Sequence, residues 1–287
     1  MDSPLFIHAG VQGMSAAQFL LLLLLAPFAY GLAASLIAFY SGRSLVKTNY
    51  RGLPVPPALG PALLLGFLAA AAGIAWSGGS PPGLTAFAML LSGAAFFGLW
   101  DDLAADQVSG FKGHFKELFK GRLSAGLLKV ITATLLALFF TGSLALPLPR
   151  RMAALFLILL STNGINLLDR RPGRALKLFF LLALLIIFLA GSAAEAARLL
   201  LPLLTAALAA APFDLNGRAM LGDSGANLLG AALGAAAVLY LSFPAQMALL
   251  LFWGGVNILS EYISISTLIE KSGWLRYLDW LGRPGES

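Results

Sequence analysis

The chain has 287 residues, of which 59% are hydrophobic and only 11% are charged. An ordinary soluble domain carries about 25% charged residues, so this composition indicates a polytopic membrane protein and argues against a soluble enzyme. The net charge of +6 is explained more simply by basic cytoplasmic loops than by nucleic-acid binding. Because the chain has no cysteine, disulfides and thiolate metal sites are excluded.

Nine apolar segments are interpreted as membrane-spanning helices, since several approach or exceed the roughly 20 residues that cross a bilayer core. The first has no basic residue before it and is long for a signal peptide, so we expect it to be retained. The predicted spans cover residues 16–39, 58–76, 83–100, 123–142, 152–168, 175–191, 194–212, 224–241 and 244–263. The expected fold is therefore all-α, a helical bundle that forms one integral-membrane domain over residues 1–287.

The distribution of Lys and Arg predicts the orientation of these spans. If the N-terminus lies outside, all 19 Lys and Arg residues except Arg150, Arg151 and Arg198 fall in cytoplasmic loops or at cytoplasmic span ends. The C-terminus then lies in the cytoplasm, and the outer loops are too short to form an outer domain. We expect any chemistry to face the cytoplasm.

Two further patterns concern packing and the membrane surface. Gly230 and Gly234 form a small-xxx-small pair inside a span, which allows helices to approach closely.

The stretch 274–281 is amphipathic and is expected to lie in the membrane interface, within a cytoplasmic segment of about residues 266–283.

Polar residues gather in four clusters, and the predicted topology puts all four on the cytoplasmic side. The first is Asp101-Asp102, at the end of an apolar segment. Carboxylates there are costly to desolvate, which suggests a function. Neighbouring helical residues diverge by ~100°, so we expect one carboxylate to face a cleft while the other caps, pairs with a Lys or holds its neighbour's proton. A solvated loop start is the alternative.

The second cluster is a basic, aromatic helix followed by a lysine inside the next span. Its aromatic and basic residues each recur every four positions, at Phe111, Phe115, Phe119, Lys112, Lys116 and Lys120. Two such stripes side by side suit a helix in the headgroup plane that binds anionic groups. Lys129, about one turn inside the span, either snorkels to the interface or binds phosphate.

The third cluster lies at the end of the fifth predicted span. Asn163, Asn166 and Asp169 are spaced by three, so they share one face if the end of the span stays helical. Buried polar side chains need partners, and a nucleotide, a sugar or a hydrated metal would supply them. Positive charge follows this cluster at Arg170, Arg171 and Arg174. These arginines either bind phosphate or only set the topology of the span.

The fourth cluster is centred on Asp223, with Ser224 and Asn227 at the start of the next span. The neighbouring Gly222 and Gly225 allow a tight turn and close approach of a ligand. Asp223 either caps this helix or binds Mg²⁺, which takes one or two protein carboxylates and completes its shell with water and phosphate. The two roles are compatible.

In this order and on one membrane face, the clusters resemble the polyprenyl-phosphate N-acetylhexosamine-1-phosphate transferases. That family includes phospho-N-acetylmuramoyl-pentapeptide transferase and the UDP-N-acetylglucosamine:undecaprenyl-phosphate N-acetylglucosamine-1-phosphate transferases. The resemblance covers about residues 20–265. It rests on the loop Arg51 to Gly60, on Asp101-Asp102 with Gly110, Gly113 and Lys129, on Asn163-x-x-Asn166-x-x-Asp169, and on Gly222-Asp223-Ser224-Gly225.

The resemblance implies transfer of a sugar-1-phosphate, from a UDP-sugar to polyprenyl phosphate, with release of UMP. The cofactor would be Mg²⁺, with Mn²⁺ as its substitute, and the reaction would serve cell-wall or surface-glycan synthesis. It would take place on the cytoplasmic face of the plasma membrane, among membrane lipids and without nucleic acid. A homodimer is a further expectation from the resemblance.

The resemblance also implies roles for individual residues. Asp223 would hold the metal, and Asp101 or Asp102 would handle or deprotonate the lipid phosphate. Asp169 would contact the nucleotide or assist catalysis. Lys129 would bind phosphate, and Asn166 would contact the nucleotide or assist catalysis. From the polar clusters themselves, Asn163, Arg174 and Asn227 are further candidates for binding substrate.

The sequence departs from the pattern of the family at two places. The family typically has a histidine-rich motif after its ninth span and then a tenth span, whereas the stretch 260–267 has no histidine and the only histidines are His8 and His114. Asp169 is followed by Arg-Arg-Pro-Gly-Arg in place of an Asp-Gly-rich continuation, so the sugar side of the site is altered. Two alternatives stay open: a non-catalytic relative that binds polyprenyl phosphate or scaffolds cell-envelope enzymes, and a lipid or solute transporter.

Overall fold

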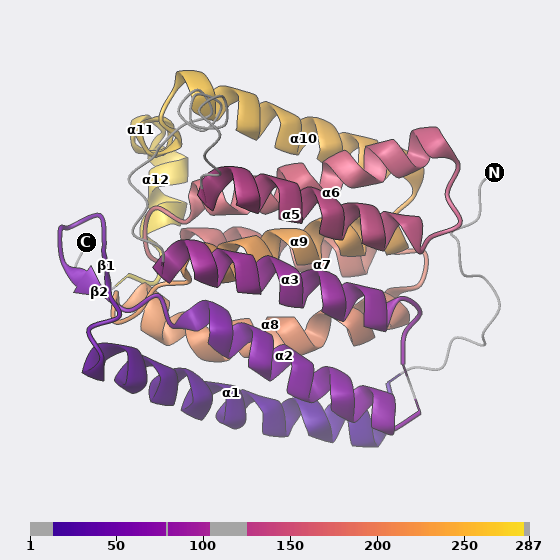
Figure 1. Cartoon of the computed structure of the whole chain (residues 1–287), viewed down its shortest axis with the longest axis horizontal. Helices are drawn as coiled ribbons and strands as arrows, with labels where there is room; N and C mark the ends of the chain where they lie inside the picture. Colours follow the sequence, from indigo (N-terminus) through magenta and orange to yellow (C-terminus); the bar gives the residue numbers. More distant parts are fainter. Residues whose placement is uncertain (1–13, 79, 104–124, 284–287) are drawn as a thin grey trace.

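The computed structural model describes residues 14–78, 80–103 and 125–283. Its long helices run side by side in one bundle, from α1 at one edge to α10 at the other (Figure 1). They are α1 (Ala16–Gly42), α2 (Leu59–Trp76), α3 (Leu84–Leu103), α5 (Ala125–Gly142), α6 (Leu148–Leu168), α7 (Arg174–Leu189), α8 (Ala193–Leu215), α9 (Gly222–Tyr240) and α10 (Phe243–Tyr262). Two short helices follow, α11 (Ile265–Lys271) and α12 (Gly273–Trp280). The predicted all-α bundle is confirmed.

Each predicted span corresponds to one of the long helices, with ends that differ by a few residues. Within the described residues, length and composition suit six helices to cross a membrane: α1, α2, α3, α6, α8 and α10. Large apolar side chains such as Phe19, Leu24, Leu251 and Ile258 are exposed on α1 and α10. Apolar residues on the outer as well as the inner face are typical of helices in lipid. The number of spans remains a prediction.

α9 lies at the centre of the bundle, where it packs against α2, α3, α6 and α7 (Figure 1). Every residue of α9 except Asp223 is buried. A Cβ atom on Gly230 would lie 2.5 Å from the carbonyl oxygen of Ser161, and one on Gly234 would lie 2.4 Å from Ser161 Oγ. The predicted close approach at these two glycines is therefore confirmed, and it occurs between α9 and α6.

One short β-hairpin, which the sequence analysis did not predict, lies between α1 and α2. Strand β1 (Lys47–Thr48) pairs antiparallel with β2 (Pro54–Val55). The side chain of Asn49 closes the turn, because its Oδ1 accepts hydrogen bonds from the backbone N–H groups of Arg51 and Leu53. Asparagine often stabilises turns in this way.

Backbone hydrogen bonds fasten this hairpin to the loop between α8 and α9. The N–H of Met220 donates to the carbonyl of Pro56 at 3.1 Å, and the N–H of Leu59 donates to the carbonyl of Met220 at 3.3 Å. Lys47 is thereby brought beside Asp223, which lies 176 residues further along the chain.

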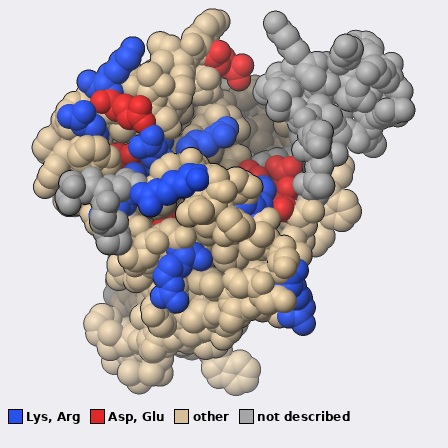
Figure 2. Space-filling view, turned by 90° about the vertical axis from the view of Figure 1, so that its left-hand side faces the viewer, with Lys and Arg blue, Asp and Glu red and all other residues tan. Residues whose placement is uncertain are grey.

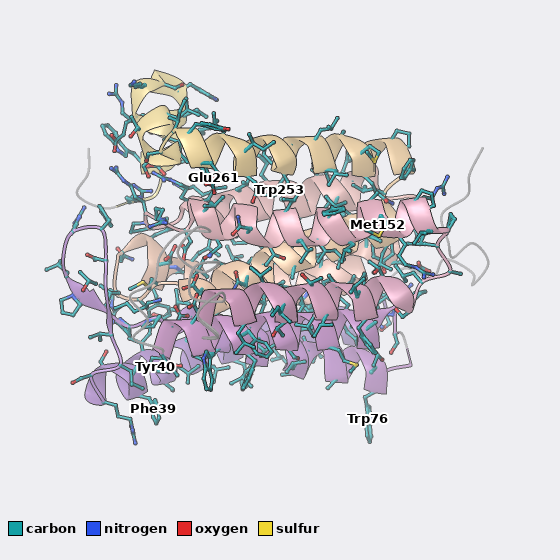
Figure 3. The ribbon with its side chains drawn as sticks, turned by 45° about the horizontal axis from the view of Figure 1, so that its top comes forward. Phe39, Tyr40, Trp76, Met152, Trp253 and Glu261 are labelled. Atoms are coloured by element: carbon teal, nitrogen blue, oxygen red, sulfur yellow. The ribbon has the colours of Figure 1, made fainter. Side chains whose placement is uncertain are left out.

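One end of the bundle is rich in basic side chains. We call the end that carries β1, β2, α11 and α12 the basic end, because Lys and Arg side chains gather there (Figures 1 and 2). Tyr40 and Glu261 lie toward this end, whereas Trp76 and Met152 lie toward the opposite end (Figure 3). The basic end corresponds to the side predicted to face the cytoplasm, and the orientation itself remains a prediction.

Candidate active site

A cavity of about 890 Å³ lies at the basic end. Its volume is in the range of pockets that hold drug-sized organic ligands, roughly 300–1,000 Å³. The hairpin, the end of α6, the α8–α9 loop and the α10–α11 link contribute its walls. Its polar lining consists of Lys47, Thr48, Asn49, Tyr50, Asn166, Asp169, Arg170, Arg171, Asp214, Asp223, Ser260, Ser264 and Ser266.

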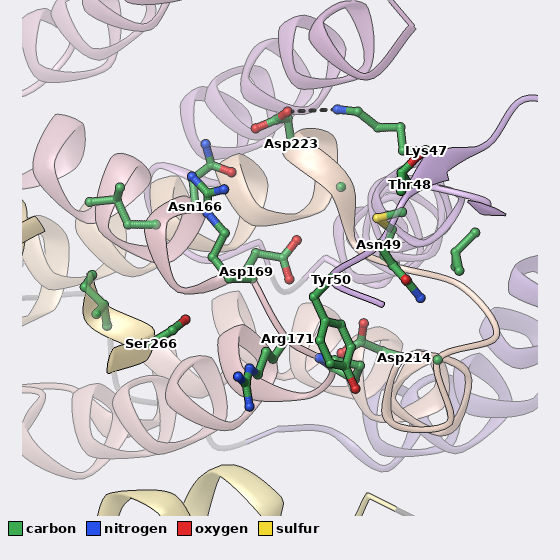
Figure 4. A pocket seen from close by; sticks show the side chains of 18 of the residues that line it. Lys47, Thr48, Asn49, Tyr50, Asn166, Asp169, Arg171, Asp214, Asp223 and Ser266 are labelled. Carbon is green, nitrogen blue, oxygen red and sulfur yellow. Dashed lines mark hydrogen bonds and ion pairs between the residues drawn. The ribbon is translucent and has the colours of Figure 1, made fainter. Parts of the chain in front are cut away.

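Lys47 connects two carboxylates beside this cavity. Its Nζ lies 2.8 Å from Asp102 Oδ1 and 3.3 Å from Asp223 Oδ2, and Figure 4 shows the second contact. The side chain of Asp102 is fully buried, while that of Asp223 is 21% exposed. A buried carboxylate is tolerated only with close partners, so the Lys47 ammonium group is part of what keeps Asp102 in place.

Asp102 also caps α9. Its Oδ1 accepts a hydrogen bond from the N–H of Asp223 and its Oδ2 accepts one from the N–H of Ser224, both at 3.0 Å. The first N–H groups of a helix have no partner inside the helix, and a side-chain oxygen commonly supplies one. The prediction that one of the paired aspartates caps and pairs with a lysine is confirmed for Asp102. The cap on α9 thus comes from α3, and the carboxylate of Asp223 faces the cavity.

Two glycines make this arrangement possible. A Cβ atom on Gly98 of α3 would lie 2.4 Å from the carbonyl oxygen of Asp223. Gly222 has a φ of +66°, in the left-handed region that favours glycine, and a Cβ atom there would lie 2.5 Å from Asp102 Oδ2. The tight turn predicted at Asp223 is confirmed.

The third polar cluster is divided by the structure. α6 remains helical as far as Leu168, as the spacing of three required. Asn166 and Asp169 line the cavity. Asn163, one turn earlier, is exposed and donates from Nδ2 to Asn257 Oδ1 of α10 at 2.6 Å. The helical face was predicted correctly, but the cavity reaches only the last turn of it.

Negative charge accumulates around Asp169. Burial raises the pKa of its carboxyl group, and the nearby carboxylates of Asp214, Asp223 and Asp102 raise it further, while Arg170 opposes them. For Lys47, burial lowers the pKa, but the attraction of Asp102 and Asp223 outweighs burial and leaves the pKa above its ordinary value of 10.5. Lys47 is therefore a cation at neutral pH.

Sequence reasoning missed two charged residues of this site, Lys47 and Asp214, as well as the uncharged polar residues of the hairpin and of the stretch 260–266. Asp214, at the end of α8, is buried, and its Oδ2 accepts a hydrogen bond from the N–H of Gly173 at 2.6 Å. It resembles Asp102 in being an acid at the basic end of an apolar segment, which is the signal that could have identified it. Lys47 had no such signal, because it is one of several basic residues in its loop.

Other predicted site residues lie away from the cavity lining. Arg174 is buried and binds Asp279 and Ser266. Asn227 is buried inside α9, and Asp101 is partly exposed next to Asp102. Lys129 belongs to α5, but its side chain lies outside the described residues, as does the predicted Phe/Lys helix at 111–120.

The donor set suits a divalent cation that also binds substrate. Within the described part of the chain, no group of three or more His, Cys, Asp or Glu could hold a metal by itself. Mg²⁺ does not need such a group, since it takes one or two protein carboxylates and completes its shell with water and phosphate. Asp223, whose carboxylate faces a cavity with further acids, fits that requirement.

Comparison with known proteins agrees with the family that the sequence resembles. Residues 84–241, more than half of the chain, match the model of a family described as glycosyl transferase family 4. The match extends from α3 to the end of α9, so it includes the acids of the site but neither the hairpin nor α10–α12. No curated protein matches the sequence. The chain therefore belongs to glycosyl transferase family 4, the family of phospho-N-acetylmuramoyl-pentapeptide transferase and the UDP-N-acetylglucosamine:undecaprenyl-phosphate transferases.

Proposed function

We propose that this protein transfers a sugar-1-phosphate, with an N-acetylhexosamine as the expected sugar, from a UDP-sugar to polyprenyl phosphate at the cytoplasmic membrane face. The observation that carries the proposal is the Lys47 bridge between Asp102 and Asp223 beside a cavity with further acids. Membership of the family supports the reaction type. A cavity at the end of a membrane bundle lies where a lipid phosphate and a soluble nucleotide can meet.

In the proposed reaction, an oxygen of the lipid phosphate attacks the β-phosphorus of the UDP-sugar. The bond from that phosphorus to the bridging oxygen breaks, and UMP leaves with the electron pair. The products are a polyprenyl diphosphate-linked sugar and UMP. Such phosphoryl transfer depends mainly on alignment of the reactants and neutralisation of charge.

The residues of the cavity would share these tasks. Lys47 offers a permanent positive charge to a phosphate oxygen, and Asp223 would hold Mg²⁺ beside it. When bound, Mg²⁺ would neutralise the diphosphate. Asp169, which lines the same cavity, would contact the nucleotide or assist catalysis. The amide of Asn166 would hydrogen-bond the nucleotide or the sugar.

The test is an assay of UMP release by the purified protein. With UDP-N-acetylglucosamine or another UDP-sugar, undecaprenyl phosphate and Mg²⁺, we expect UMP, and chelation of Mg²⁺ should stop its release. Asp223→Asn should abolish release if Asp223 holds the metal. Glu261→Gln, which removes an exposed acid at the same end of the bundle, is the matched control and should keep its activity. Absence of UMP with every UDP-sugar in a broad set would overturn the proposal.

A second candidate function is a non-catalytic relative that binds polyprenyl phosphate. The observation that favours it is the stretch 260–267, which has no histidine where the family typically has several. This candidate predicts lipid-phosphate binding that is indifferent to Mg²⁺ and to Asp223→Asn, together with no release of UMP.

A further inference from the structure

The C-terminal helices are fastened to the bundle by a buried cluster of charges. Arg174, at the start of α7, contacts Asp279 of α12 twice, from Nε to Oδ1 at 2.8 Å and from Nη2 to Oδ2 at 3.0 Å. Arg283 Nη2 approaches the same Oδ1 at 2.8 Å, and its Nε donates to the carbonyl of Pro172 at 2.7 Å. The three charged side chains are only 6%, 4% and 2% exposed. Breaking one partner out of such a cluster leaves a buried charge uncompensated.

Other basic side chains of the same region also bind the C-terminal helices. Lys177 Nζ donates to the carbonyl groups of Leu278, Asp279 and Leu281, at 2.8, 2.6 and 3.1 Å. A lysine at the C-terminal end of a helix satisfies its last carbonyl groups and its dipole. Arg171 pairs with Glu270 of α11. The basic residues that follow Asp169 therefore hold α11 and α12 across the basic end (Figure 1).

The same cluster reaches the wall of the cavity. Arg174 Nη1 donates to Ser266 Oγ at 2.9 Å. Ser266 and Ile265, at the start of α11, line the cavity together with Ser264 of the α10–α11 link. The guanidinium group of Arg174 thus joins α12, which does not line the cavity, to Ser266 in the cavity wall. Movement of Asp279 would release Arg174, and Ser266 would lose its partner.

We propose that Asp279 is a positioning residue, which acts through Arg174 to hold residues 264–266, at the start of α11, in place as one wall of the donor cavity. The helices α11 and α12 lie beyond residues 84–241, which match the family. The identity of the ligand, a UDP-sugar, rests on the proposed function. The position of the wall is independent of the proposed function.

The first test measures the position of α11 directly. Because the chain has no cysteine, spin labels can be attached only at Ser41→Cys on α1 and Lys271→Cys on α11, both of which are exposed. Electron–electron double resonance should give a narrow distance distribution in the otherwise unchanged protein and a broad one after Asp279→Asn. The matched control is Glu261→Gln, which removes an exposed acid of α10, and it should leave the distribution narrow. An unchanged distribution in Asp279→Asn would overturn the proposal.

A second variant guards against global misfolding. Arg283→Gln removes one partner of Asp279 and keeps both contacts with Arg174, so we expect a folded protein with an intermediate distribution. If Arg283→Gln broadens the distribution more than a folded Asp279→Asn variant does, Arg174 is not the connection and the proposal fails.

The kinetic test separates this inference from the proposed function. In the UMP assay, Asp279→Asn should raise KM for the UDP-sugar about tenfold, the effect of losing one or two hydrogen bonds at a ligand, with a smaller change in kcat. A fall in kcat with unchanged KM would contradict a role in the donor wall. If the unaltered protein releases no UMP, the proposed function fails, while a broadened distance distribution would still support the role of Asp279.

Discussion

The Nζ atom of Lys47 lies 2.8 Å from Asp102 Oδ1 and 3.3 Å from Asp223 Oδ2, so one ammonium group joins the hairpin, α3 and α9. Asp102 in turn caps the helix that begins with Asp223. A change at any of these three residues therefore affects the charge balance of the cavity as well as the start of α9.

Replacement of Lys47 should remove most of the activity. Lys47→Met eliminates the positive charge at the site proposed for the transferring phosphate, and loss of one such electrostatic contact typically costs about 10²–10³ in kcat. Lys47→Arg should retain part of the rate, since it keeps the charge. The measurement is UMP release, with Lys271→Met as control because Lys271 is an exposed lysine at the same end. Equal activities of Lys47→Met and the control would exclude a phosphate-binding role for Lys47.

The substitution Gly98→Ala, which adds a methyl group, should destabilise the protein and reduce its activity. The added Cβ would lie 2.4 Å from the carbonyl oxygen of Asp223, so α3 and α9 must separate, and overpacking of this kind costs about 1–3 kcal/mol. Gly255→Ala on α10 is the matched control, because nothing lies within 4 Å of its added Cβ, and alanine favours a helix by up to ~1 kcal/mol over glycine. Thermal unfolding in detergent should show a lower midpoint for Gly98→Ala only.

Asp214 should matter for stability mainly as a hydrogen-bond acceptor. Its Oδ2 receives the N–H of Gly173 at 2.6 Å in a buried setting, and an N–H group left without a partner costs about 1–3 kcal/mol. Asp214→Ala should therefore lower the free energy of unfolding by that amount. Asp214→Asn keeps an acceptor oxygen, so its loss should be smaller. Chemical denaturation measures the free energy of unfolding of both variants. Equal losses in Asp214→Ala and Asp214→Asn would show that the link between α6 and α7 depends on the charge of Asp214 and not on its acceptor oxygen.

The attachment of α12 should survive mild acid. Burial raises the pKa of Asp279, but the hydrogen bonds and charges of Arg174 and Arg283 outweigh burial and hold it below the ordinary value of 3.8. A carboxyl group whose pKa is lowered in the folded state contributes stability that is present above its unfolded pKa and is lost as the pH falls through its folded pKa. The stability difference between the unaltered protein and Asp279→Asn should thus be constant from neutral pH to about pH 5 and shrink only in stronger acid. Thermal unfolding over this pH range measures it, and a difference that already shrinks near pH 6 would contradict the lowered pKa.

The long helices could be predicted from the sequence because their signal is local. A run of about 20 apolar residues identifies a membrane helix without reference to any other part of the chain. The order of the motifs at Asp101-Asp102, Asn166 to Asp169 and Asp223 was likewise sufficient to indicate the family, which the family model then confirmed. Gly222, next to Asp223, correctly indicated a tight turn.

The partners of the charged residues could not be read in this way. Lys47 reaches Asp223 only because a hairpin and two backbone hydrogen bonds to Met220 hold its loop against α9. Arg174 looks like a phosphate ligand in the sequence, yet its guanidinium group binds Asp279, 105 residues away. An ion pair depends on distance in space and on burial, and neither quantity is encoded in the spacing of neighbouring residues. The apolar pattern therefore specified which segments are helices and where their polar ends lie, whereas the packing of α3, α9 and the hairpin selected which of those polar residues meet.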